Sequence, residues 1–162
     1  MKAFAPPAPG DIVWCRFPRV EGISPGPKPR PALILAVQDD VVPARVRVAY
    51  GTSRGADEVK PGEFRIGPED GVAFSASGLA LPTKFSMLKT VVLDYTDHWF
   101  APAPARPPRQ SPRLGVLHPT LLPRARAAYE ETVRTLSVRE RLDAVYAVRP
   151  ALVDELMRDL RA

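Results

Sequence analysis

The sequence predicts a mainly β domain, a small barrel or sandwich, followed by C-terminal α-helices. Short apolar or alternating runs fill residues 1–100, and Pro and Gly punctuate them as turn residues. The spacing of about 30 residues that is typical of βαβ units does not occur there. After a Pro-rich stretch, the apolar residues change to a helical period. The chain has 162 residues, which suits about one domain.

Five strands are expected in the first hundred residues. The run at 32–37 is continuously apolar and fits a buried strand, whereas 44–50 alternates, with Val46, Val48 and Tyr50 inward and Ala49 outward. A helical turn is expected at 68–74, and the stretch 81–85 is predicted to be a loop. The expected strands are 11–17, 32–37, 44–50, 63–66 and 89–95.

Three regions follow from this pattern: a β region at 1–100, a Pro-rich connector at 101–117 and a helical region at 118–162. The connector is predicted to be stiff and extended because proline restricts its backbone. The stripe over 119–136 predicts a helix that packs on the β region. A capping box formed by Ser137 and Glu140 opens a second helix. For 137–161, packing on the same domain and contact with a partner are equally open.

Composition excludes several functional classes. One Cys and two His, without close spacing, exclude a disulfide framework and a zinc finger. Neither a membrane-spanning apolar run nor a signal peptide is visible, so a soluble cytoplasmic protein is expected. The net charge of +5 is concentrated in 103–162, which holds 11 basic and 7 acidic side chains, against 12 and 11 in 1–102. This excess permits a nucleic-acid partner without requiring one.

Two short motifs carry side chains suited to binding phosphate. Arg30 lies between two prolines that restrict the backbone, and its planar guanidinium matches phosphate oxygens. Thr52, Ser53 and Arg54 follow Gly51 at the end of an expected strand. Taken alone, each motif also fits a simpler role, as a solvated arginine or as a Ser/Thr turn. Lys84 in the 81–85 loop could contact a nucleotide, or that loop could simply carry a buried Phe.

Taken together, several segments resemble the PemK/MazF family of toxins from type II toxin–antitoxin systems. The resemblance covers residues 9–100 and rests on GDIVWCRF at 10–17, KPRPALIL at 28–35, VRVAYGTS at 46–53 and KTVVL at 89–93. It implies a small SH3-like β-barrel, a homodimer, a cognate antitoxin and endoribonuclease activity on single-stranded RNA without metal or other cofactor.

The resemblance also implies roles for individual residues. Arg30 and Thr52 match the family's active-site pair, while Lys28, Ser53, Arg54 and Lys84 match positions that contact RNA. In such a site Arg30 would stabilise the charged phosphoryl oxygens and assist the leaving 5′-oxygen, and Thr52 would orient the phosphate or the 2′-hydroxyl. The first loop lacks the acidic residue or Gln that the family often has shortly before the arginine. The general base therefore stays open among Glu21, Asp11 and His98.

Two further functions fit the same sequence. One is a barrel that binds RNA or protein without catalysis, and the other is a toxin that grips gyrase. The pairing of Arg30 with Thr52 favours the endoribonuclease, since a gyrase poison would not require both residues.

Overall fold

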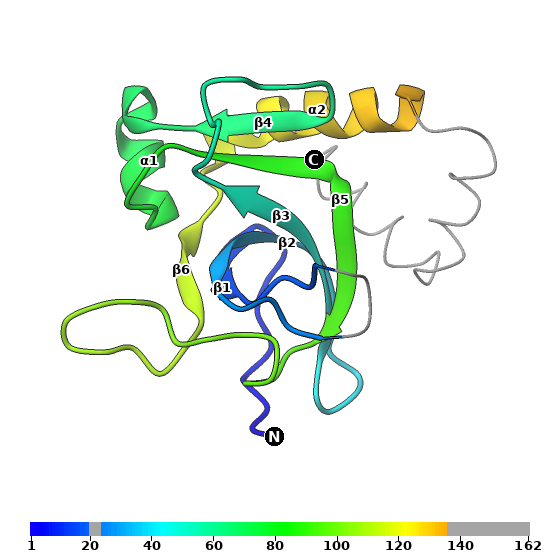
Figure 1. Cartoon of the computed structure of the whole chain (residues 1–162), viewed down its shortest axis with the longest axis vertical. Helices are drawn as coiled ribbons and strands as arrows, with labels where there is room; N and C mark the ends of the chain where they lie inside the picture. Colours follow the sequence, from blue (N-terminus) through cyan, green and yellow to red (C-terminus); the bar gives the residue numbers. More distant parts are fainter. Residues whose placement is uncertain (20–23, 136–162) are drawn as a thin grey trace.

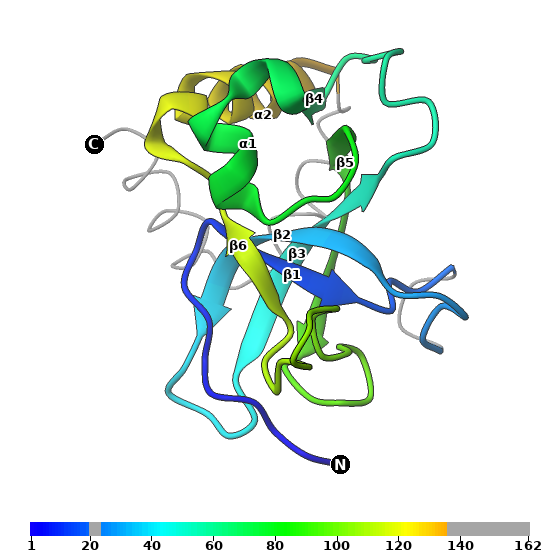
Figure 2. The ribbon, with the colours of Figure 1, turned by 90° about the vertical axis from the view of Figure 1, so that its left-hand side faces the viewer.

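A computed structural model shows a mainly β protein and describes residues 1–19 and 24–135. Its strands form one antiparallel sheet in the order β4-β5-β3-β2-β1-β6. The sheet curls, and both helices lie at the end of the molecule opposite the N-terminus (Figures 1 and 2). The expected helices beyond residue 136 fall outside the described residues. The strands are β1 (Asp11–Cys15), β2 (Arg30–Gln38), β3 (Arg45–Thr52), β4 (Glu63–Ile66), β5 (Thr83–Asp94) and β6 (Arg113–Val116).

Strand β5 is longer than expected and is sharply bent. The prediction of a loop at 81–85 is wrong from Thr83 onward, and the strand expected at 89–95 is only the second half of β5. Between the pairs Ala49↔Thr90 and Tyr50↔Ser86, β5 carries extra residues that β3 does not match. Figure 1 shows β5 turning a corner along its length. Such a bulge bends a sheet and changes the direction of the side chains beside it.

The curled sheet buries side chains on both faces. Successive residues of a strand point to opposite faces, so Ile12 enters one apolar cluster and Val13 the other. Val46 and Val48 are buried as expected. The prediction that Ala49 points to solvent is wrong, because side chains of α1, α2, β4 and β5 cover that face. The other cluster packs side chains of β1, β2, β3 and the second half of β5 against Tyr95 and Phe100.

The Pro-rich stretch is not a simple connector. Residues 113–116 form β6, which pairs with β1, so the sheet continues beyond residue 100. The stretch leaves β1 and returns to it: Ala101 N donates to Trp14 O, and Trp14 N donates to Pro112 O. Between these points Ala103 N donates to Ser111 O and closes the loop. Backbone hydrogen bonds to β1 therefore hold both ends of this stretch.

Short helices complete the core at one end of the sheet. The 3-10 helix η1 (Pro68–Asp70) and the helix α1 (Val72–Ser77) lie in the region expected as a helical turn. The 3-10 helix η2 (Pro119–Leu121) leads into α2 (Leu122–Thr135), which confirms a helix within 119–136. Leu121, Ala125 and Ala128 are buried against the sheet, as the stripe predicted. No helix in the described part of the chain is long and apolar enough to cross a membrane.

An ion pair fastens α2 to the segment after β4, and it predicts acid sensitivity. Arg124 donates two hydrogen bonds to Asp70, at 3.0 and 2.9 Å, and these lower the pKa of the carboxyl. The folded pKa lies below the unfolded value, so the stabilisation is present above the unfolded pKa and is lost as pH falls through the folded pKa.

We expect Asp70→Asn to lower the stability at pH 7 by about 1–2 kcal/mol, because hydrogen bonds to a charged group are lost while Arg124 is partly solvated. The difference between variant and wild type should shrink at pH 3. Thermal melts at both pH values measure it, and Asp94→Asn is the matched control because its ion pair with Arg45 is half exposed on both sides. An equal loss of stability in the two variants at pH 7 would contradict this reading.

Candidate functional site

Arg30 and Thr52 lie at neighbouring strand ends. Arg30 begins β2, where it pairs with Cys15, and Thr52 ends β3, where it pairs with Lys84. Continuing the β2–β3 register two residues beyond Ala32↔Tyr50 brings Arg30 level with Thr52. Residues opposite each other in an antiparallel pair point to the same face. The continued register therefore predicts that the side chains of Arg30 and Thr52 leave the sheet on the same face.

Gly51 allows the two strands to approach each other closely at this point. A Cβ at position 51 would lie 2.5 Å from the carbonyl oxygen of Pro31 and 2.7 Å from the ring of Phe85. Both distances are shorter than real Cβ contacts. The sequence indicated that Gly51 ends a strand, and the structure adds that it is sandwiched between β2 and the Phe85 ring.

Arg30 carries a charge that no acidic group neutralises within residues 1–19 and 24–135. Its half-buried side chain forms neither a hydrogen bond nor an ion pair with those residues. Thr52 Oγ1 accepts a hydrogen bond from Arg54 N at 3.1 Å, which is the expected Ser/Thr turn. Its proton is still available to donate, because a hydroxyl is both donor and acceptor. The pair can therefore present a cation and an O–H donor to an anion.

The remaining cations differ in accessibility. The cations Lys28 and Arg54 are exposed around the same strand ends, as is the neutral Ser53. Lys84, by contrast, is buried; its Nζ lies 3.1 Å from Glu63 Oε2 and donates to the carbonyl oxygen of Glu58 at 3.0 Å. This ammonium is already neutralised and holds β4 and the β3–β4 loop together. We therefore leave Lys84 out of the site.

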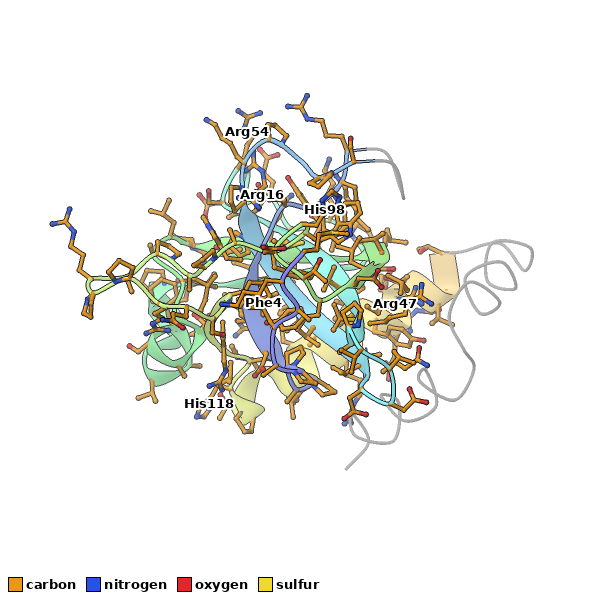
Figure 3. The ribbon with its side chains drawn as sticks, turned by 90° about the horizontal axis from the view of Figure 1, so that it is seen from below. Phe4, Arg16, Arg47, Arg54, His98 and His118 are labelled. Atoms are coloured by element: carbon orange, nitrogen blue, oxygen red, sulfur yellow. The ribbon has the colours of Figure 1, made fainter. Side chains whose placement is uncertain are left out.

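Of the two candidate bases in the described part of the chain, Asp11 and His98, only His98 lies at this end of the sheet. Asp11 is the first residue of β1, whereas Arg30 pairs with Cys15, the last residue of that strand. The Asp11 carboxylate accepts hydrogen bonds from Arg113 Nε and Ala8 N. His98 precedes Trp99, whose carbonyl accepts a hydrogen bond from Arg16 N just beyond β1. Figure 3 shows Arg16, Arg54 and His98 on one side of the molecule, with His118 on the opposite side. Glu21 lies outside the described residues.

Sequence reasoning missed an aromatic group beside this pair. The ring of Tyr50 packs edge-on against Phe17 with centroids 5.2 Å apart, and Lys89 Nζ lies 4.0 Å from the Tyr50 ring centroid. Tyr50 stands two residues before Thr52 on β3 and shares its face. That spacing was readable in the sequence. The position of Lys89 was not, because it depends on the bulge in β5.

Other features of the molecule are less suited to chemistry. A trough of about 630 Å³ runs between β4 and α2, and its lining includes neither Arg30 nor Thr52. Its main charged groups already pair with each other, as Arg124 does with Asp70. Burial raises the pKa of the Cys15 thiol, which leaves it a poor nucleophile. No group of three or more His, Cys, Asp or Glu in the described part of the chain could hold a metal ion.

No protein-family model matches this chain. A search of curated proteins finds no significant match either.

Proposed function

We propose that this chain is the toxin of a type II toxin–antitoxin system, an endoribonuclease of PemK/MazF type that cleaves single-stranded RNA without a metal ion. The observation that carries the proposal is the β2–β3 register, which brings Arg30 level with Thr52 when it is continued two residues beyond Ala32↔Tyr50. Both residues lie in segments that carry the sequence resemblance, at 28–35 and 46–53. The curled antiparallel sheet is compatible with an SH3-like barrel, and we include that fold in the proposal.

The proposed chemistry is transesterification at a phosphodiester. The 2′-oxygen forms a bond to phosphorus, the bond to the 5′-oxygen breaks, and the products carry a 2′,3′-cyclic phosphate and a 5′-hydroxyl. Negative charge grows on the phosphoryl oxygens, where a fixed donor can be worth about 3 kcal/mol. The Arg30 guanidinium supplies charge and donors, and the Thr52 hydroxyl orients the phosphate or the attacking group. The 2′-hydroxyl loses its proton and the 5′-oxygen gains one; His98 is our candidate to move it.

A single-stranded substrate and protein partners complete the proposal. Unpaired RNA suits the site because its bases can be splayed apart and its phosphates are accessible. Arg54 and Lys28 add exposed positive charge near the pair. By the same resemblance, we propose a homodimer and a cognate antitoxin protein that binds the toxin.

The direct test is cleavage of single-stranded RNA by the purified full-length chain in EDTA, with analysis of the product ends. We expect cuts bearing cyclic phosphates. Thr52→Val keeps the shape but removes the hydroxyl, so it should slow cleavage by roughly tenfold or more. Thr52→Ser is the matched control and should retain most of the activity.

Other results would redirect the assignment. RNA that is bound but not cleaved would favour a non-catalytic RNA-binding barrel. A folded chain that neither binds nor cleaves RNA would favour a protein target such as gyrase. Equal cleavage by Thr52→Val and wild type would remove Thr52 from the mechanism.

A further inference from the structure

We infer that Tyr50 and Lys89 form a subsite for the nucleotide next to the cleaved phosphate: its base displaces the Lys89 ammonium from the Tyr50 ring, and the ammonium then binds its phosphate. This inference rests on the proposed function and adds how the substrate is held. Both residues lie in segments that carry the sequence resemblance, but neither is among the site residues that the resemblance implied.

The first support is position along β3. Tyr50 lies two residues from Thr52, which is about 7 Å along an extended strand. Both side chains point to the face that carries Arg30. A nucleotide chain whose phosphate sits at Arg30 and Thr52 would therefore bring its neighbouring base over Tyr50.

The second support is the bulge in β5. The extra residues between Ser86 and Thr90 displace the strand, and Lys89 N donates to Ser86 Oγ at 3.3 Å. As a result the Lys89 ammonium reaches across to the Tyr50 ring, on the strand beside it. Bulges recur near functional sites because they redirect a single side chain in this way.

The third support is the chemical character of the cluster. Phe17 packs edge-on against Tyr50, so the Tyr50 ring is held in one orientation. Lys89 is exposed, and neither it nor the half-buried Arg30 forms an ion pair within the described ranges. Two cations without acidic partners beside an ordered aromatic ring suit a ligand with phosphates and flat bases. Stacking on an aromatic ring and charge along the backbone are how proteins hold single-stranded nucleic acid.

The test measures binding separately from cleavage. A fluorescent 2′-O-methyl oligonucleotide lacks the nucleophilic hydroxyl, so its anisotropy reports binding by the intact chain alone. We expect Tyr50→Ala to weaken binding roughly tenfold and Tyr50→Phe to change it less than about twofold, because stacking requires only the ring. In a series with one abasic position each, one position should weaken binding to the wild type but not to Tyr50→Ala.

The lysine is tested by salt dependence. Lys89→Gln should lower the slope of log affinity against log salt by about 0.7, the value for one lost phosphate contact on a single strand. Lys60→Gln is the matched control, since Lys60 is an exposed lysine in the β3–β4 loop. If Tyr50→Ala unfolds, which circular dichroism would show, Lys89→Gln and Tyr50→Phe still decide the question.

Two outcomes would overturn the inference, and they differ in what else they affect. If the wild type cleaves RNA while the Tyr50 and Lys89 variants bind like the wild type, the subsite is wrong and the proposed function stands. If the wild type binds no oligonucleotide even at low salt, both are wrong.

Discussion

Arg30→Ala should abolish most RNA cleavage while leaving the fold intact. The side chain is half-buried at the first residue of β2 and forms no hydrogen bond or ion pair with the described residues, so its removal breaks no polar interaction within that part of the chain. What is lost is the cation that faces the developing charge, and removing one such donor typically costs a factor of about 100 to 1,000 in rate. Cleavage rates of the two proteins, together with their melting temperatures, measure both halves of this expectation.

Arg30→Lys separates charge from geometry. Lysine keeps the charge but lacks the planar fork that donates two parallel hydrogen bonds. We expect it to recover only a small part of the lost rate. Arg45→Ala is a suitable control because Arg45 lies at the other end of β3 and pairs with Asp94. If Arg30→Ala cleaves RNA as fast as the wild type, the proposed role of Arg30 is wrong.

Gly51→Ala should destabilise the whole protein by about 3 kcal/mol, the upper end of the usual cost of overpacking, because the contacted atoms cannot move aside. One of the contacted atoms is the backbone carbonyl of Pro31, and the other contact is the buried ring of Phe85. Relief would require β2 and β3 to separate where Arg30 and Thr52 meet. Cleavage should therefore fall as well, even at temperatures where the variant is still folded.

Gly55→Ala is the control that measures the cost of replacing a glycine where no atom is crowded. Gly55 has φ of 63°, and a Cβ there would meet nothing within 4 Å. Gly55→Ala should cost only about 1–2 kcal/mol, from strain in the left-handed region. Urea denaturation of both variants compares the two costs. A Gly51→Ala protein as stable as Gly55→Ala would show that the strands at position 51 can yield.

The sequence predicts the first four strands well, and local signals explain why. Turn residues and apolar runs locate the first four strands, and consecutive antiparallel strands place the start of β2 beside the end of β3. That is enough to bring Arg30 next to Thr52. The buried face of α2 is predicted equally well from local sequence, because its apolar residues recur with the helical period.

The features that the sequence does not predict depend on distant partners. Lys84 looks like a loop cation because Pro82 precedes it, but the strand continues and Glu63 of β4 neutralises the ammonium. β6 is short and follows a Pro-rich stretch, so only its pairing with β1 reveals it as a strand. The bulge that aims Lys89 appears only once β5 is aligned with β3.

The place of β1 in the sheet affects how the chain folds. β1 is among the first segments to be synthesised, yet one of its edges pairs with β6 near Val116. Until that distant segment arrives, β1 presents open backbone groups that another chain could pair with. Contacts between such separated segments slow folding, typically to milliseconds or longer. The folding chain is therefore most exposed to aggregation while the edge of β1 waits for β6.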